Sequence, residues 1–221
     1  MKFRIFAVAA VAALLGSVAG AADFEGKPYP LSTCPVSGEP LGSMGEPVQL
    51  NVDGRDVKLC CAGCQKKFDA DTASFLAKVH DGIISQQTEL YPLNTCVVSG
   101  QELGSMGEPV SKVYGNQLVQ FCCAGCVKKV DADPATYTAK IDEATIAGQS
   151  DSYPFDKCVV SGEKLGDHGK VVDVTSGGRL VRLCCAGCEP KFNANPSKFL
   201  SMIESGKMSG GNAEGSDHKH E

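Results

Sequence analysis

The sequence predicts a small, cysteine-rich α+β protein made of three tandem modules, each with a cysteine knuckle, a β-hairpin and two short helices. The first observation behind this is that all 12 cysteines follow one pattern that recurs every 62 residues. The second is that each copy contains alternating strand-like runs around a hairpin turn, followed by helical periodicity. A repeat this regular usually means one structural unit copied in tandem. The single cysteines of C-x-V-S-G are Cys34, Cys96 and Cys158, and those of the C-C-A-G-C motifs are Cys60, Cys61, Cys64, Cys122, Cys123, Cys126, Cys184, Cys185 and Cys188.

Residues 1–21 have the features of a secretory signal peptide. Lys2 and Arg4 precede an apolar run over 5–15, and Ala19-Gly20-Ala21 fits a cleavage site. The apolar run is shorter than the roughly 20 residues that cross a bilayer. We therefore expect a periplasmic or secreted protein with no integral membrane segment after cleavage. An uncleaved anchor is the alternative.

Composition limits what the mature chain can do. The formal net charge is −5, and loss of Lys2 and Arg4 would make it −7, which argues against nucleic acid as a partner. The expected repeats, 29–79, 91–141 and 153–203, contain no tryptophan. Units of this size rarely fold on a hydrophobic core alone and usually need disulfides or a metal.

Within the first repeat, the elements follow from local patterns. Cys34 followed by Gly38 suggests a tight knuckle turn. Residues 48–52 alternate apolar and polar side chains, as a half-buried strand does, and 57–59 return as its partner. Asp53-Gly54 between them is a hairpin signal. The equivalent turns are Gly115-Asn116 and Gly177-Gly178.

Two helices are expected after the paired cysteines. The first covers 62–68, and the second has apolar residues on one face up to Val79. Asp133-Pro134 and Asn195-Pro196 mark the start of the second helix in the later repeats. The connectors 80–90 and 142–152 are mostly polar, and we expect frayed helix ends running into linkers. The tail 206–221, rich in glycine, serine and charge, should be disordered.

The cysteine spacing predicts one thiolate site per repeat. Cys60 and Cys64 would face the same side if the helix began at Cys60, and Cys61 and Cys64 form a C-x-x-C pair. Either pair, joined by Cys34 from the knuckle, makes a three- or four-sulfur site for Zn(II) or Cu(I), up to one ion per repeat. Amide groups at a helix start favour the thiolate that metals bind. Ser37 is expected to hydrogen-bond the knuckle turn.

Four sequence features follow one another in the same order: C-x-V-S-G, a hairpin, C-C-A-G-C-x-x-K-F/V and a D/N-A-D/N-P helix. Together they resemble the YHS and TRASH-type heavy-metal-binding modules. The resemblance covers all three repeats and implies a treble-clef-like fold that binds soft metals for trafficking, resistance or sensing. The family's ligand pattern matches the first, second and fourth cysteine of each repeat. Here the first spacing is somewhat longer than in TRASH modules, and each repeat has one additional cysteine. The signal peptide argues against a DNA-linked sensor.

A loop in each repeat offers a further ligand type. It holds Met44, Met106 and His168 at equivalent positions. Thioether and imidazole differ as core residues, but both bind copper, so they are candidate auxiliary ligands. A loop residue without a role is the alternative.

Three functions follow from these patterns. The first is an exported metal-binding protein for buffering, trafficking or resistance, with metal ions and a metal-transfer protein as partners. The second is a tandem binding or scaffold module stapled by disulfides, in which Cys34 pairs with Cys60 or Cys61 and Cys64 with the other. The third is a thiol–disulfide redox protein, suggested by C-A-G-C at a helix start. We expect no enzyme, because no catalytic constellation recurs.

Overall fold

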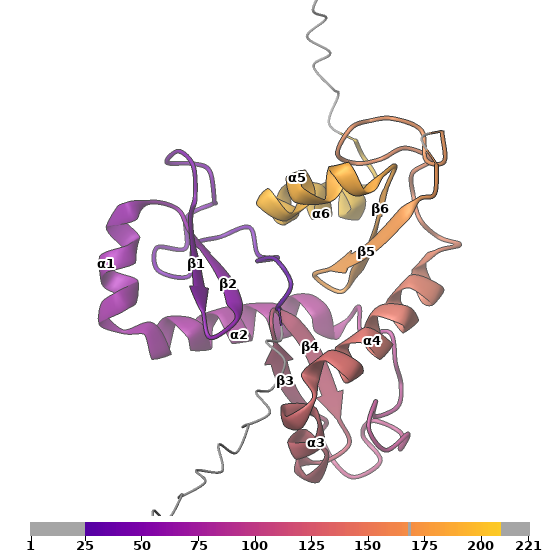
Figure 1. Cartoon of the computed structure of the whole chain (residues 1–221). Coiled ribbons are helices and arrows are strands. Elements are labelled where there is room, and N and C mark those ends of the chain that lie inside the picture. The colour runs from indigo at the N-terminus through magenta and orange to yellow at the C-terminus, as the bar shows by residue number, and fades with distance from the viewer. Residues whose placement is uncertain (1–24, 168, 209–221) are drawn as a thin grey trace, which may run out of the picture.

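The computed structural model describes residues 25–167 and 169–208, and there the protein is a small α+β structure. These residues form three two-stranded antiparallel sheets and six α-helices (Figure 1). The expected signal peptide, His168 and all but three residues of the expected tail lie outside the described residues.

The same order of elements occurs three times. The first repeat contains β1 (Val48–Val52), β2 (Arg55–Leu59), α1 (Ala62–Ala70) and α2 (Thr72–Thr88). The second contains β3 (Val110–Tyr114), β4 (Gln117–Phe121), η1 (Ala124–Cys126), α3 (Val127–Ala132) and α4 (Pro134–Gln149). The third contains β5 (Val172–Ser176), β6 (Arg179–Leu183), η2 (Ala186–Cys188), α5 (Glu189–Ala194) and α6 (Pro196–Ser205).

The three hairpins share one register and one type of turn. Val48 pairs with Leu59, and the equivalent pairs recur in the other two sheets. Both central turn residues have positive φ, as a type I′ turn requires: 51° and 75° at Asp53 and Gly54, and 49° and 69° at Gly115 and Asn116. The expected hairpins are therefore confirmed, and local turn chemistry fixes their register.

The second helix of the first two repeats is longer than the sequence suggests. Asp71 caps α2 by accepting a hydrogen bond from the Ser74 amide at 3.3 Å, and Asp133 caps α4 in the same way. The helices then continue through most of the connectors 80–90 and 142–152. The expectation of frayed ends and linkers was wrong, because these segments pack against the next repeat.

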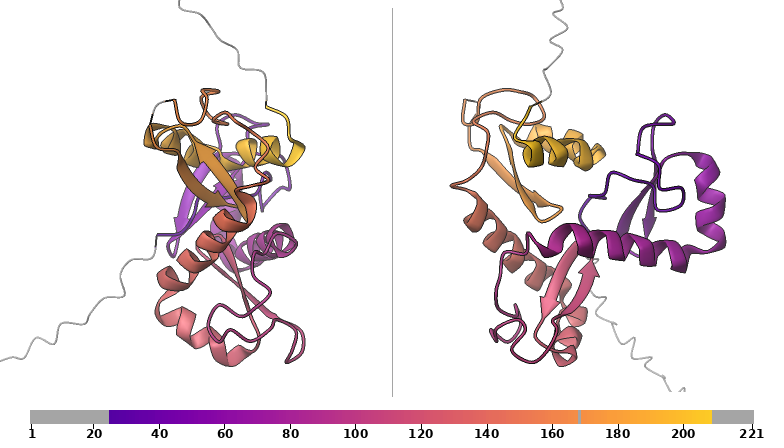
Figure 2. Two further views of the ribbon diagram at one scale, coloured as in Figure 1. Left: turned by 90° about the vertical axis from the view of Figure 1, so that its right-hand side faces the viewer. Right: turned by 180° about the vertical axis from the view of Figure 1, so that it is seen from behind.

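Each of these long helices is bonded to the hairpin that follows it. The Gln87 side chain donates to the Asn116 carbonyl at 3.0 Å and accepts from the Leu118 amide at 2.9 Å. Gln149 makes the same two bonds with the third repeat, at 2.9 and 2.8 Å. Figure 2 shows α2 running from the first hairpin to the second. Consecutive repeats are thus joined by packed helices.

Contacts also join the first repeat to the third. The Lys58 ammonium donates to the Asn193 carbonyl at 3.2 Å, at the C-terminal end of α5. Near the N-terminus of the described chain, Lys27 donates to Asp142 at 2.8 Å and to the Thr175 hydroxyl at 2.6 Å. Each repeat therefore contacts both of the others.

Each repeat has its own small core, and the cysteines belong to it. In the first repeat, Phe68, Val79 and Ile83 from the helices pack with Leu59 of β2, all at most 1% exposed. The core continues directly into Cys34, Cys60 and Cys64. Among the described residues, no helix is long and apolar enough to cross a membrane.

Candidate metal centre

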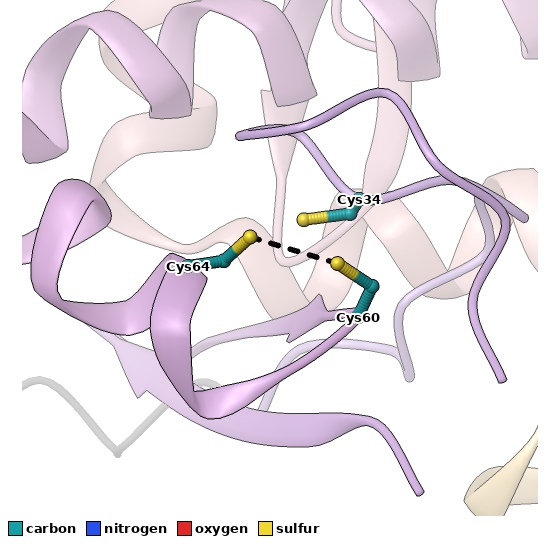
Figure 3. Close-up of side chains that lie close together, drawn as sticks. All are labelled: Cys34, Cys60 and Cys64. Carbon is teal, nitrogen blue, oxygen red and sulfur yellow. Dashed lines mark hydrogen bonds between the residues drawn. The ribbon is translucent and has the colours of Figure 1, made fainter. Parts of the chain in front are cut away.

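Three cysteines converge in each repeat. The sulfur atoms of Cys34, Cys60 and Cys64 all lie within 4.8 Å of one another (Figure 3). The same holds for two other sets, Cys96, Cys122 and Cys126, and Cys158, Cys184 and Cys188. Three cysteine clusters that can hold metal ions are therefore present.

The first cysteine of each cluster lies on a tight knuckle. The Cys34 amide donates to the Glu39 carbonyl at 2.8 Å, and the Gly38 amide donates back to the Cys34 carbonyl at 2.8 Å. Gly38 has a φ of 77°, in the left-handed region that favours glycine. This requirement explains the glycine of C-x-V-S-G.

The other two cysteines come from the junction between a strand and a helix. Cys60 directly follows β2, and Cys64 lies in the first turn of α1. The helix begins at Ala62, as expected, and not at Cys60: Cys61 is the N-cap, with extended φ of −164° and ψ of 165°. Cys60 and Cys64 still face each other, with their sulfur atoms 3.5 Å apart.

Cys61 lies beside this group but is not one of its three members. Its sulfur is 3.9 Å from that of Cys60 and 3.9 Å from that of Cys64. Whereas Cys34 and Cys60 are at most 1% exposed, Cys61 is partly exposed. Cys123 and Cys185 are likewise partly exposed, each 4.0 Å from the cysteine before it.

A serine in each knuckle contacts the site, which the sequence interpretation did not anticipate. The Ser37 hydroxyl accepts from the Glu39 amide at 3.3 Å, as expected for a turn. It also lies 3.2 Å from the Cys60 sulfur, and Ser99 and Ser161 repeat this contact. The recurrence of a serine three positions after each knuckle cysteine was the sequence feature that could have predicted this contact.

The knuckle cysteines are arranged to ionise. Burial opposes the charge on Cys34, but the Cys60 amide, the Ser37 hydroxyl and amide, and the Val36 amide together lower its pKa to about 7. Equivalent hydrogen bonds outweigh burial in the other repeats, where the pKa is about 6 for Cys96 and about 7 for Cys158. The knuckle thiol of each cluster is therefore readily ionised near neutral pH, and the thiolate is the form that binds a metal cation.

The helix cysteines behave differently. Burial, followed by the neighbouring thiols, raises the pKa of Cys64, and likewise of Cys126 and Cys188, to about 12. The pKa of Cys61 is lowered, first by the Cys64 amide. Without a cation, a buried set of three sulfurs cannot all be charged, so each cluster retains a proton that a metal would displace.

The spacing of the sulfurs fits a soft metal ion. Zn(II)–thiolate bonds of about 2.3 Å in a tetrahedral site place sulfur atoms about 3.8 Å apart. The second and fourth cysteines of the three repeats are separated by 3.5, 3.9 and 3.7 Å. Thiolate is also the donor that selects Zn(II) and Cu(I) over hard cations.

All twelve cysteines are free thiols, so the disulfide pairings that the sequence left open are not formed. The methionines considered as auxiliary ligands are exposed, Met44 by 64% and Met106 by 66%. They therefore lie toward solvent, unlike the buried cysteine clusters.

The chain was compared with protein families, with curated proteins and with solved structures, and no match was found.

Proposed function

We propose that the protein is an exported soft-metal-binding protein that holds one Zn(II) or Cu(I) ion per repeat for buffering, trafficking or resistance. The observation that supports this best is the threefold recurrence of a cluster of three sulfurs within 4.8 Å of one another, in which every cysteine except the partly exposed Cys126 is buried. One such cluster can arise where three residues happen to pack together. Three clusters at equivalent positions in a single chain imply a shared chemical requirement.

Stability gives a second reason for a metal. Each repeat is small, and its thiol cluster extends the core instead of lying on the surface. Structural zinc sites contribute about 10 kcal/mol or more of binding free energy to the fold that holds them. An ion bound to each cluster would supply stabilisation that so small a core lacks.

We also propose that each repeat is a treble-clef-like module similar to the YHS and TRASH-type domains. The order of knuckle, hairpin and helix supports this, with ligands at the knuckle and at the helix start. Export is proposed from residues 1–21, and the mass of the mature protein would test it by locating the N-terminus after Ala21.

The metal hypothesis is tested by counting ions and thiols. Protein purified without oxygen should contain about one soft-metal ion per repeat and, once stripped, twelve reactive thiols. Cys34→Ser, Cys96→Ser and Cys158→Ser should each remove one ion from the total. Ser43→Ala, at an exposed position of the same loop region, is the matched control. Wild-type protein without metal after anaerobic reconstitution would refute the proposal.

Thiol–disulfide exchange is a second candidate function. The partly exposed Cys61 has a lowered pKa and lies 3.9 Å from the buried Cys64, an arrangement suited to a nucleophilic and a resolving thiol. Rapid reduction of insulin disulfides by metal-free protein, lost in Cys61→Ser, would support this function.

A further inference from the structure

The third cysteine of each repeat, which is Cys61 in the first, occupies a different position from the other three. Cys60 and Cys64 form an edge 3.5 Å long that is shared by two possible sets of three sulfurs. The inner set is completed by buried Cys34, and the outer set by partly exposed Cys61, 3.9 Å from both sulfurs of the edge. An ion can therefore pass from the inner to the outer set while it keeps two of its ligands.

The residues beside this outer thiol have small side chains. Ala62 and Gly63, which follow Cys61, are both exposed. A Cβ atom on Gly63 would approach only the Cys61 sulfur, at 3.7 Å, and would otherwise meet open space. Gly125 and Gly187 have the same surroundings, with the Cys123 and Cys185 sulfurs at 3.7 Å.

The backbone does not require these glycines. None of the three has the positive φ found at the knuckle and hairpin glycines. Gly63 is the second residue of α1, and Gly125 and Gly187 lie in short 3-10 turns, so glycine has no conformational advantage over alanine there. Its presence in all three repeats, beside the outer thiol, fits a need for access to that sulfur.

We propose that Cys61, Cys123 and Cys185 are exchange ligands through which each repeat passes its ion to a thiol-bearing acceptor. The inference rests on the proposed function and deepens it. Access next to the sulfur indicates an acceptor that must approach closely, and the softness of the ion indicates that its donor atoms are thiols. The acceptor that fits best is a protein segment with two neighbouring cysteines, because it can replace both sulfurs of the shared edge.

The exchange is a ligand substitution with no change in oxidation state. The Cys61 sulfur bonds to the ion as the bond to Cys34 breaks. The first acceptor thiol would then bond through the open side as Cys60 leaves, the second would displace Cys64, and the bond to Cys61 would break last. Each thiol that binds gives up its proton, and these protons pass to the released cysteines. One released cysteine remains a thiolate or takes a proton from water.

The test separates holding an ion from transferring it. Metal-loaded protein is mixed with a Cys-x-x-Cys peptide, and transfer is followed by native mass spectrometry. The triple variant C61S/C123S/C185S should hold as many ions as the wild type but transfer them at least about tenfold more slowly. Transfer at the wild-type rate, or loss of ions from the variant, would overturn the proposal.

An access variant tests the glycines independently. G63L/G125L/G187L retains every thiol and should slow transfer to the peptide while leaving transfer to dithiothreitol unchanged. Equal slowing with both acceptors would mean that the leucines distort the site, and no slowing with either would mean that access is irrelevant. Both results would refute the role assigned to the glycines. K66L/K128L, exposed one turn further along the helix, is the control.

These outcomes are distinguishable from failure of the proposed function. Wild-type protein that binds no soft metal would refute metal binding itself, and exchange with it. Wild-type protein that binds three ions, whose serine variant transfers them equally fast, would refute exchange alone.

Discussion

Replacing Gln87 with leucine should uncouple the first repeat from the second. The Gln87 side chain is 3% exposed and bonds the Asn116 carbonyl and the Leu118 amide of the next hairpin. Leucine has a similar volume but no hydrogen-bonding group. Each backbone group left buried without a partner costs about 1–3 kcal/mol, so the loss of both bonds should lower the stability by about 2–6 kcal/mol. This is a large fraction of the stability of a typical domain.

The measurement is urea unfolding of the metal-free and metal-loaded protein. We expect the transition of Q87L to begin at lower urea and to broaden or split, because each repeat is stabilised by its neighbour. Q149L should cost less, since Gln149 is only partly buried and water can replace its bonds. Q101L, at an exposed position, should change little. Q87L with unfolding indistinguishable from Q101L would refute the reasoning.

Three further outcomes are expected. Metal loading at about pH 8 should release at least about one proton per ion, because the Cys64 thiol, with a pKa of about 12, must lose its proton to bind. Calorimetry in two buffers of different ionisation enthalpy measures the number of protons released. Binding without proton release would contradict this expectation. Lys27→Met should lower the free energy of unfolding by about 1–3 kcal/mol, because the hydrogen bonds to Asp142 and Thr175 are lost. Urea unfolding measures this, and an unchanged urea midpoint would contradict it. Met44→Ala should leave Cu(I) affinity unchanged in a competition titration because its side chain is exposed, whereas weaker binding would place this loop over the site.

Much of the fold could be predicted because its determinants are local. The Asp53-Gly54 and Gly115-Asn116 turns require positive φ at both central residues, and few residue pairs provide this. Cysteines that recur every 62 residues place one candidate cluster in each repeat. Their convergence could be expected because each repeat is too small for a hydrophobic core to stabilise it alone.

The packing between repeats could not be predicted in this way. The connector residues Gln87 and Gln149 are polar, and a pattern of apolar and polar residues assigns them to the surface. Their bonding partners lie about thirty residues later in the chain and are backbone groups, which leave no trace in the sequence. The contact between Ser37 and Cys60 was missed for a related reason, since a serine in a turn is explained locally without any distant partner.

The same packing links consecutive thiol clusters mechanically. Cys64 lies in the first turn of α1, and α1 leads into α2. Gln87, in the last turn of α2, is bonded to the Leu118 amide of β4. β4 then runs directly into Cys122, so the strand that places a thiol in the second cluster is held by the helix that follows the first. α4 and Gln149 make the same connection to β6, which leads to Cys184. An ion that fixes α1 at one cluster therefore also limits the motion of the next strand. We expect binding at one site to favour binding at the next and Q87L to reduce this effect, so unchanged stepwise affinities in Q87L would show that the sites are independent.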